Sequence, residues 1–172
     1  MTLELHQVFG NLVMQEADFI VNASNTKLIL GSGVSMAIRR HCGMGLQQEM
    51  NAVRAKVEDA GGIIKQGDVL QTSSAGAKNF SYILHAAVMN YGQGVRHGEK
   101  QPSLATIERI LVNCIPYFER GAESGKQVVA AFPYLGCGVG GLDKRDVLQV
   151  FESFVAKPCS VNVLIKLCDL KN

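Results

Sequence analysis

Short apolar runs alternate with amphipathic segments along most of the chain, and this alternation restricts the fold more than any other feature of the sequence. Residues 18–23 ("DFIVNA"), 80–89 ("FSYILHAAVM") and 126–132 ("KQVVAAF") are apolar at most positions, which is typical of strands covered on both faces. Apolar residues recur at helical spacing over 46–57 and 104–115, as in amphipathic helices. The pattern predicts a three-layer α/β/α sandwich around a mixed, mainly parallel central sheet.

Several residues mark where the predicted helices begin or end. A helical pattern begins near Val34, and Ser103 and Asp143 are good N-caps for two later helices. Pro116 lies inside the pattern that follows Ser103. Because proline lacks the amide hydrogen that a helix interior needs, we expect it to kink or shorten that helix.

Length and composition fit one globular domain. The chain has 172 residues, of which 47% are hydrophobic, enough to bury a core. There is no internal repeat, and the glycine-rich segment 92–102 is typical of a surface loop rather than a linker between domains. We therefore expect a single domain over residues 1–172.

The cysteines and the lack of targeting signals predict a cytoplasmic protein. The start, "MTLELHQVFG", is not a signal-peptide pattern, and no apolar run approaches the roughly 18 residues of a membrane span. The five cysteines form no CxxC pair, as expected of free thiols in a reducing compartment. His41 and His97 have no partners at metal-ligand spacing. We expect no metal, no cofactor and no membrane partner.

Two glycine-rich loops are the strongest functional signal. Segment 21–34 ("VNASNTKLILGSGV") and segment 132–143 ("FPYLGCGVGGLD") each follow a buried strand and precede a helix. Ligands of open α/β sheets bind outside the carboxyl ends of strands, and glycine lets the backbone approach a ligand closely. Backbone N–H groups at helix N-termini suit phosphate oxygens. The pair predicts a diphosphate site between the loops; the alternative is that both are merely tight turns.

The second loop also satisfies the dinucleotide pattern GxGxxG, in "GCGVGG" at 136–141. That fingerprint normally follows the first strand and has an acidic residue about 20 positions later, at the end of the next strand. Here it comes late in the chain, before a last strand that ends near Asp169. The match is weak evidence for a nicotinamide cofactor.

Two asparagines stand at the mouth of the first loop. A carboxamide both donates and accepts hydrogen bonds, which suits ribose hydroxyls. The alternative is that one of them closes a local turn. For Asn22 the two interpretations have equal weight, whereas Asn25, nearer the glycines, is the better candidate for ligand contact.

Taken together, these segments resemble the macro domain family. "IVNASN" followed by "LGSGVSMAI" resembles its signature, "GNL" at 10–12 its GDI segment, "YILHAAV" an internal strand, and "AFPYLGCGVGGLD" its second phosphate loop. The segments occur in family order over nearly the whole chain. The resemblance implies a three-layer α/β/α fold that binds ADP-ribose, with the diphosphate between the two loops.

The resemblance also implies a role for individual residues. Asn11 would lie near adenine, Asn25 would meet the distal ribose, and His85 would be structural. The full predicted ADP-ribose-binding set is Asn11, Leu12, Asn22, Asn25, Gly31, Ser32, Gly33, Val34, Ser35, Gly136, Cys137, Gly138, Val139, Gly140, Gly141, Cys168 and Asp169. Cys137 has two interpretations. It is either a reactive thiol whose pKa is lowered by a helix N-terminus or, as we favour, a small residue that fits beside the ligand.

The chain departs from the family pattern at four points. Asn11 stands where many members have aspartate, and a neutral acceptor binds less tightly than a charged one. Ser35 stands where de-ADP-ribosylating members often have aspartate, and Gly140 where an aromatic often packs on the ribose. Cys168 and Asp169 stand where an aromatic often stacks on adenine. These departures favour binding over catalysis.

Two other functions stay open at this point. One is an ADP-ribosyl hydrolase that removes mono-ADP-ribose from protein or nucleic acid, or that deacylates or dephosphorylates the distal ribose, with Asn25 and Asp143 as catalytic candidates. Some similar macro domains use a lysine that bonds covalently to the sugar, but the strand "LHAAVM" that would supply it has no lysine. For Asp143, capping of the following helix is the favoured role. The other is a module that binds poly-ADP-ribose or nucleic acid, with arginines 39, 40 and 54 on one surface, although the formal net charge is only +2.

Overall fold

The computed structural model describes residues 1–31, 33–123 and 125–170. Six strands form one sheet: β1 (Leu3–Phe9), β2 (Ala17–Asn25), β3 (Val69–Ser73), β4 (Phe80–Met89), β5 (Val128–Pro133) and β6 (Val163–Asp169). The α-helices are α1 (Val34–Cys42), α2 (Gly45–Asp59), α3 (Leu104–Gly121) and α4 (Lys144–Val155). Two short 3-10 helices, η1 (Leu12–Met14) and η2 (His97–Glu99), lie in connections.

The sheet is mixed and mainly parallel, as predicted. Its strand order is β1-β6-β5-β2-β4-β3. Every neighbouring pair is parallel except β3 and β4, which are antiparallel. The carboxyl ends of β1, β2, β4, β5 and β6 therefore meet at one edge of the sheet, where both glycine-rich loops begin.

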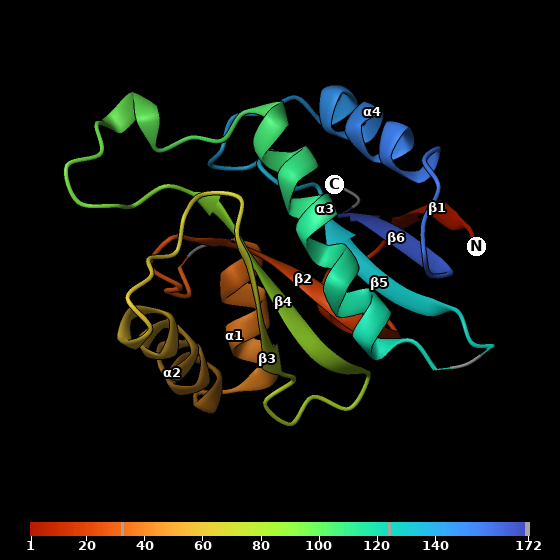
Figure 1. The fold of residues 1–172 in the computed structure, drawn as a ribbon, viewed down its shortest axis with the longest axis horizontal. Helices are drawn as coiled ribbons and strands as arrows, with labels where there is room; N and C mark the ends of the chain where they lie inside the picture. Colours follow the sequence, from red (N-terminus) through yellow and green to blue (C-terminus); the bar gives the residue numbers. More distant parts are fainter. Residues whose placement is uncertain (32, 124, 171–172) are drawn as a thin grey trace.

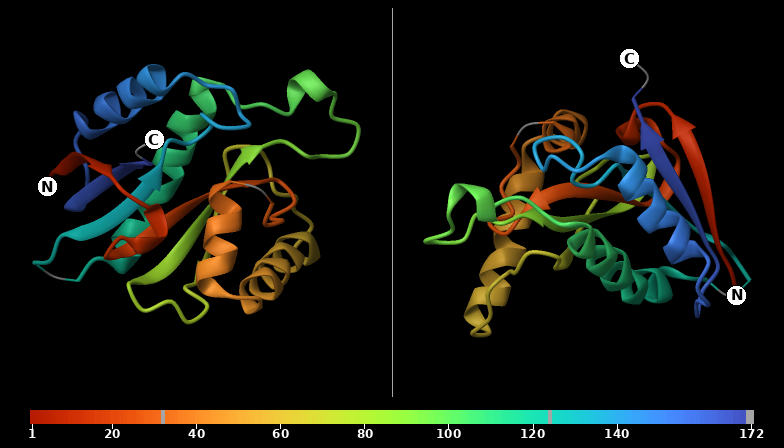
Figure 2. Two further views of the ribbon diagram at one scale, coloured as in Figure 1. Left: turned by 180° about the vertical axis from the view of Figure 1, so that it is seen from behind. Right: turned by 90° about the horizontal axis from the view of Figure 1, so that it is seen from above.

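Helices cover both faces of the sheet, which confirms the three-layer arrangement. In the view of Figure 1, α3 and α4 lie in front of the sheet, and α1 and α2 come to the front when the molecule is turned (Figure 2). Strand β2 contributes to both layers: Phe19 and Val21 pack with residues of α3 and α4, whereas Ile20 packs with residues of α1 and α2. Burial on both faces explains why this strand is apolar at consecutive positions.

Two features of the elements differ from the sequence-based expectations. Of the two expected effects of Pro116, a kink or a shortened helix, the shortening is wrong, because α3 continues past Pro116 to Gly121. Proline removes the hydrogen bond to the carbonyl four residues earlier, that of Val112, and both residues lie on the solvent side of the helix, where water can satisfy that carbonyl. Strand β2 runs two residues beyond the expected Ala23, because Ser24 and Asn25 still pair with β4.

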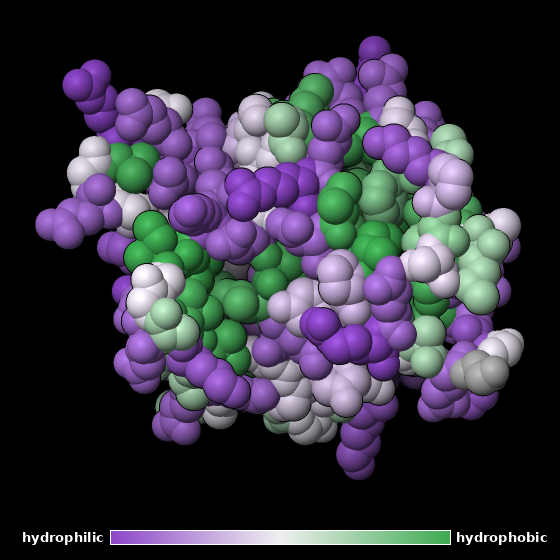
Figure 3. All heavy atoms as spheres, in the orientation of Figure 1, coloured by the Kyte–Doolittle hydropathy of each residue, from purple (hydrophilic) through white to green (hydrophobic). Residues whose placement is uncertain are grey.

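The surface shown in Figure 3 is largely hydrophilic, and its hydrophobic residues gather in separate patches. A hollow of about 300 Å³ lies between α2, β3 and α3 and is lined by apolar residues such as Val57, Ile64 and Leu70. All five cysteines are free thiols. None of the helices within the described parts of the chain combines the length and apolar character of a membrane crossing.

Candidate functional site

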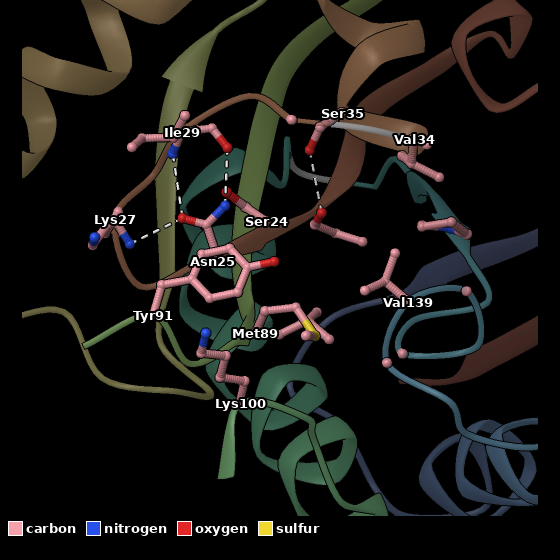
Figure 4. A pocket seen from close by; sticks show the side chains of 18 of the residues that line it. Ser24, Asn25, Lys27, Ile29, Val34, Ser35, Met89, Tyr91, Lys100 and Val139 are labelled. Carbon is pink, nitrogen blue, oxygen red and sulfur yellow. Dashed lines mark hydrogen bonds between the residues drawn. The ribbon is translucent and has the colours of Figure 1, made fainter. Parts of the chain in front are cut away.

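A cavity of about 610 Å³ opens at the carboxyl edge of the sheet (Figure 4). Both glycine-rich loops contribute to its wall, together with the ends of β2, β4 and β5. The predicted site residues that line it are Asn25, Gly31, Gly33, Val34, Ser35, Gly136, Gly138, Val139 and Gly140. The two loops thus face one shared space, as the sequence predicted.

The first loop is held in shape by side chains from β2 and α2. Asn25 accepts hydrogen bonds through Oδ1 from the amides of Lys27 (3.0 Å) and Ile29 (3.4 Å), and its Nδ2 donates to the Ile29 carbonyl (2.9 Å). Gln47 accepts from the Leu30 amide (2.8 Å) and donates to the Leu28 carbonyl (2.9 Å). The loop-closing role that the sequence left open for an asparagine therefore belongs to Asn25, and one N–H of its Nδ2 remains for a ligand.

The first loop ends in an exposed helix N-terminus. Gly33 is the N-cap of α1 and has φ +63° and ψ −129°, a conformation that needs glycine. Among the described residues no side chain caps this helix, so its first amide groups are suited to bind an anion. Val34 and Ser35, the first two helical residues, both line the cavity.

The second loop folds back on its own backbone. Gly136 and Gly141 have positive φ angles of 79° and 75°, and the Leu142 amide donates to the Gly136 carbonyl (2.9 Å). A Cβ on Gly140 would lie 2.5 Å from the Gly136 carbonyl oxygen. Gly140 is therefore required by this close approach, which explains why no aromatic side chain stands there.

A buried chain of polar groups supports the first loop from behind. The Ser35 hydroxyl donates to Asn22 Oδ1 (2.9 Å), Asn22 Nδ2 lies 3.0 Å from His85 Nδ1, and His85 Nε2 lies 2.8 Å from Thr72 Oγ1. The Asn22 Nδ2 group can only donate, so His85 Nδ1 accepts this hydrogen bond. The hydrogen of the neutral ring is therefore on Nε2, which donates to Thr72 Oγ1. Burial lowers the pKa of His85 to about 3, so the ring is neutral. Asn22 is fully buried, and its bond to Ser35 connects it to the cavity wall.

Asn11, Cys168 and Asp169, which the resemblance associates with adenine, lie outside the cavity wall, as does Leu12 of the predicted binding set. Asn11 is exposed, and its Oδ1 accepts from the Val13 amide, which caps η1. Leu12 and Cys168 are buried. Asp169 accepts a hydrogen bond from Lys144 Nζ (2.6 Å), and its carbonyl accepts from the Gly10 amide. Asn11 and Asp169 form a rim where β1 and β6 end.

The rim adjoins the cavity through Lys144. Its Nζ, bonded to Asp169, also lies 5.5 Å from the centre of the Tyr134 ring, and Tyr134 lines the cavity. Cys137 and Gly141 belong to the second loop but not to the cavity wall, and Ser32 lies outside the described residues. Burial raises the pKa of the Cys137 thiol to about 11, which argues against a reactive thiolate and for a small packing residue.

The remaining candidates lie away from the cavity wall. Asp143 caps α4 by accepting from the Arg145 amide (2.8 Å), the role favoured from the sequence. Arg54 forms an ion pair with Glu58 (2.8 Å), and residues 39 and 40 lie in the last turn of α1, at the end opposite the cavity. No group of three or more potential metal ligands occurs in the described parts of the chain.

Sequence reasoning missed the part of the wall that comes from β4 and the segment after it. Residues 90–102 project from the body of the molecule (Figure 1), but the two ends of this segment are tied together by the Asn90 amide, which donates to the Lys100 carbonyl. The Tyr91 amide donates to Thr26 Oγ1 (2.8 Å). Tyr91 and Lys100 consequently line the cavity. The available signal was that β4 ends at the same edge as β2.

The cavity wall is electropositive. Its charged side chains are Lys27 and Lys100, and among the described residues no carboxylate lines it. Two lysines and an uncapped helix N-terminus favour an anionic ligand. The volume is within the range of small-molecule sites.

Comparisons with known proteins agree with this geometry. The model of the family described as Macro domain matches residues 21–151. A macro domain-containing protein of Listeria monocytogenes is 32% identical over 150 residues, covering 86% of this chain and 76% of the relative. The O-acetyl-ADP-ribose deacetylase of an Enterobacter species is 28% identical over 174 residues, covering 98% of this chain and 89% of the relative.

Solved structures show the same fold. A variant of the Oceanobacillus iheyensis macrodomain with ADPR has a TM-score of 0.73 at 21% identity, covering 95% of this chain and 84% of that chain. The macrodomain of Thermus aquaticus DarG has a TM-score of 0.68 at 22% identity, covering 95% and 98% of the two chains.

Proposed function

This chain belongs to the macro domain family, and from that premise we propose that it binds ADP-ribose, free or attached to a macromolecule. The observation that carries the proposal is that two glycine-rich loops, far apart in sequence, line one cavity of about 610 Å³. Each loop leads into a helix. Backbone amides from both loops are suited to the diphosphate of this ligand.

The diphosphate would lie between Gly33 and Gly138, next to the N-terminus of α1. The positive end of the helix dipole and the lysine side chains would stabilise its charge. The distal ribose would extend toward Asn25, where one N–H of the carboxamide remains available. The adenine would rest on the rim formed by Asn11 and Asp169.

Binding is better supported than hydrolysis, but one relative supports an enzymatic role. The Enterobacter protein named O-acetyl-ADP-ribose deacetylase covers almost the whole chain. A similar reaction here would act on an ester of the distal ribose, with a water positioned between sugar and diphosphate; positioning alone supplies much of the rate of such reactions. Asn25 would orient that water, because Asp143 is outside the cavity wall.

Titration calorimetry tests the binding proposal. ADP-ribose is expected to bind more tightly than ADP, and ADP more tightly than AMP, because each contains one more of the groups that the site contacts. A Ser74→Ala protein is the control, since the Ser74 hydroxyl donates to the Ala77 carbonyl and Ser74 does not line the cavity. If millimolar ADP-ribose produces no binding heat, the proposal is wrong. Release of acetate from O-acetyl-ADP-ribose separately tests the enzymatic role.

A further inference from the structure

One buried hydroxyl in the cavity wall has no hydrogen-bond partner. Ser24 is only 2% exposed, and its Oγ is the buried side-chain polar atom left unpaired among the atoms that the structure describes. It lines the cavity beside Asn25 (Figure 4). Buried polar groups in folded proteins are nearly always hydrogen-bonded, and an exception calls for a specific explanation.

The strand places this hydroxyl firmly. Side chains alternate along β2, so Asn22 and Ser24 share a face, and Ser24 is one step closer to the carboxyl edge. Ser24 pairs with Ala87 while Asn25 pairs with Met89, which leaves Val88 as an extra residue in β4. Such bulges occur next to functional sites, where they re-aim side chains. A hydroxyl on a central strand is positioned more precisely than one on a loop.

Another serine of the cavity wall, and one outside it, satisfy their hydroxyls within the protein. Ser35, in the same cavity wall, donates to Asn22 Oδ1, and Ser74 donates to the Ala77 carbonyl. Of the two serines that line the cavity, Ser24 is therefore the one whose hydroxyl is left without a partner. A group that binds there has to supply the missing partner.

We propose that the Ser24 hydroxyl hydrogen-bonds a hydroxyl of the distal ribose and so selects ligands that carry this sugar over those that end at the diphosphate. The inference rests on the proposed function. A serine hydroxyl both donates and accepts, as a sugar hydroxyl does, whereas the backbone amides and lysines around the cavity only donate and so suit phosphate. A site built to pair a hydroxyl discriminates against analogues that lack it, because its own polar group is then left buried and unpaired.

The test compares ADP-ribose with ADP in the wild-type protein and in Ser24→Ala, Ser24→Cys and Ser74→Ala. Loss of one neutral hydrogen bond corresponds to an affinity change of about fivefold. We expect both Ser24 variants to bind ADP-ribose about fivefold more weakly and ADP almost unchanged, with Ser74→Ala unchanged for both. Ser24→Ala should also melt about 2–4 °C higher without ligand, because it removes an unpaired buried hydroxyl.

The combination of higher stability and weaker ADP-ribose binding separates a ligand contact from a structural role, which would lower both. Equal affinity of the wild type and Ser24→Ala for ADP-ribose would overturn the inference. Equal losses for ADP-ribose and ADP would also overturn it, since the contact would then be with the diphosphate or with a water. A wild type that binds neither ligand contradicts the proposed function itself, and the inference with it, and is recognised without any variant.

Discussion

Acid should lower the stability of the fold through His85. Its neutral ring lies between Asn22, which bonds Ser35 of the cavity wall, and Thr72 of β3. Burial lowers the pKa of His85 from the ordinary 6.5 to about 3. Below pH 6.5 the unfolded chain takes up a proton that the folded protein does not accept, so stability is lost as the pH falls from 6.5 toward 3. The difference in proton affinity corresponds to about 2 kcal/mol of lost stability at pH 5 and about 3 kcal/mol at pH 4.

The measurement is urea unfolding of the wild type and of His85→Gln between pH 7 and pH 4. His85→Gln should be less stable than the wild type at pH 7, because it disturbs the bonds to Asn22 and Thr72, but its stability should fall less with acid. The gap between the two proteins should therefore narrow by about 2 kcal/mol between pH 7 and pH 5. His6→Gln, at an exposed position of β1, controls for the loss of a histidine as such.

Carboxylates also lower the stability of both proteins in acid. Their contribution cancels in the difference in stability between the wild type and His85→Gln, because both proteins have the same carboxylates. Parallel stability curves for wild type and His85→Gln across this pH range would refute the assignment of a neutral, buried ring. They would mean that His85 titrates in the folded protein much as it does in the unfolded chain.

Three further predictions concern the cavity itself. Gly140→Ala should lose roughly 1–3 kcal/mol of stability and weaken ADP-ribose binding, because its Cβ meets the Gly136 carbonyl oxygen. The control is Gly138→Ala, whose Cβ would have no atom within 4 Å and whose stability should stay within about 0.5 kcal/mol of the wild type. Equal stability of the two variants would contradict the packing argument. Asn25→Ala removes the three loop hydrogen bonds of that side chain and should weaken ADP-ribose binding in calorimetry; unchanged affinity would exclude Asn25 from the site. Lys100→Met should weaken binding about tenfold at low salt and flatten its salt dependence, and a salt dependence equal to that of the wild type would separate Lys100 from the diphosphate.

The sequence predicted those features of the site that depend on local backbone conformation. Gly33, Gly136 and Gly141 have positive φ angles, and such positions are readable because few other residues adopt them. The place of each loop in the fold was also predictable, since each loop comes directly after a buried strand along the chain. The cavity between the loops was therefore predictable before its wall was known.

Side-chain roles were less predictable, because they depend on contacts that local sequence does not contain. Asn22 and Asn25 are three residues apart and chemically identical, yet one is buried against His85 and the other closes a turn. The contribution of Lys100 depends on a backbone hydrogen bond across residues 90–100, and nothing in the glycine-rich composition of that segment specified it. The unpaired state of Ser24 depends on which groups surround it in the folded protein, and the local sequence does not contain this information.

The composition of the wall also bears on whether this site binds or turns over its ligand. General acid–base catalysis requires a group of suitable pKa within hydrogen-bond reach of the proton that moves. Among the described residues, the ionisable side chains of the wall are two lysines and two tyrosines, with no carboxylate and no histidine. The hydrolysis proposed above therefore assigns the attack to a water positioned by Asn25, with no carboxylate or histidine of the described wall as base. In that proposal the protein contributes the position of the water and the ligand, which by itself can supply much of the rate.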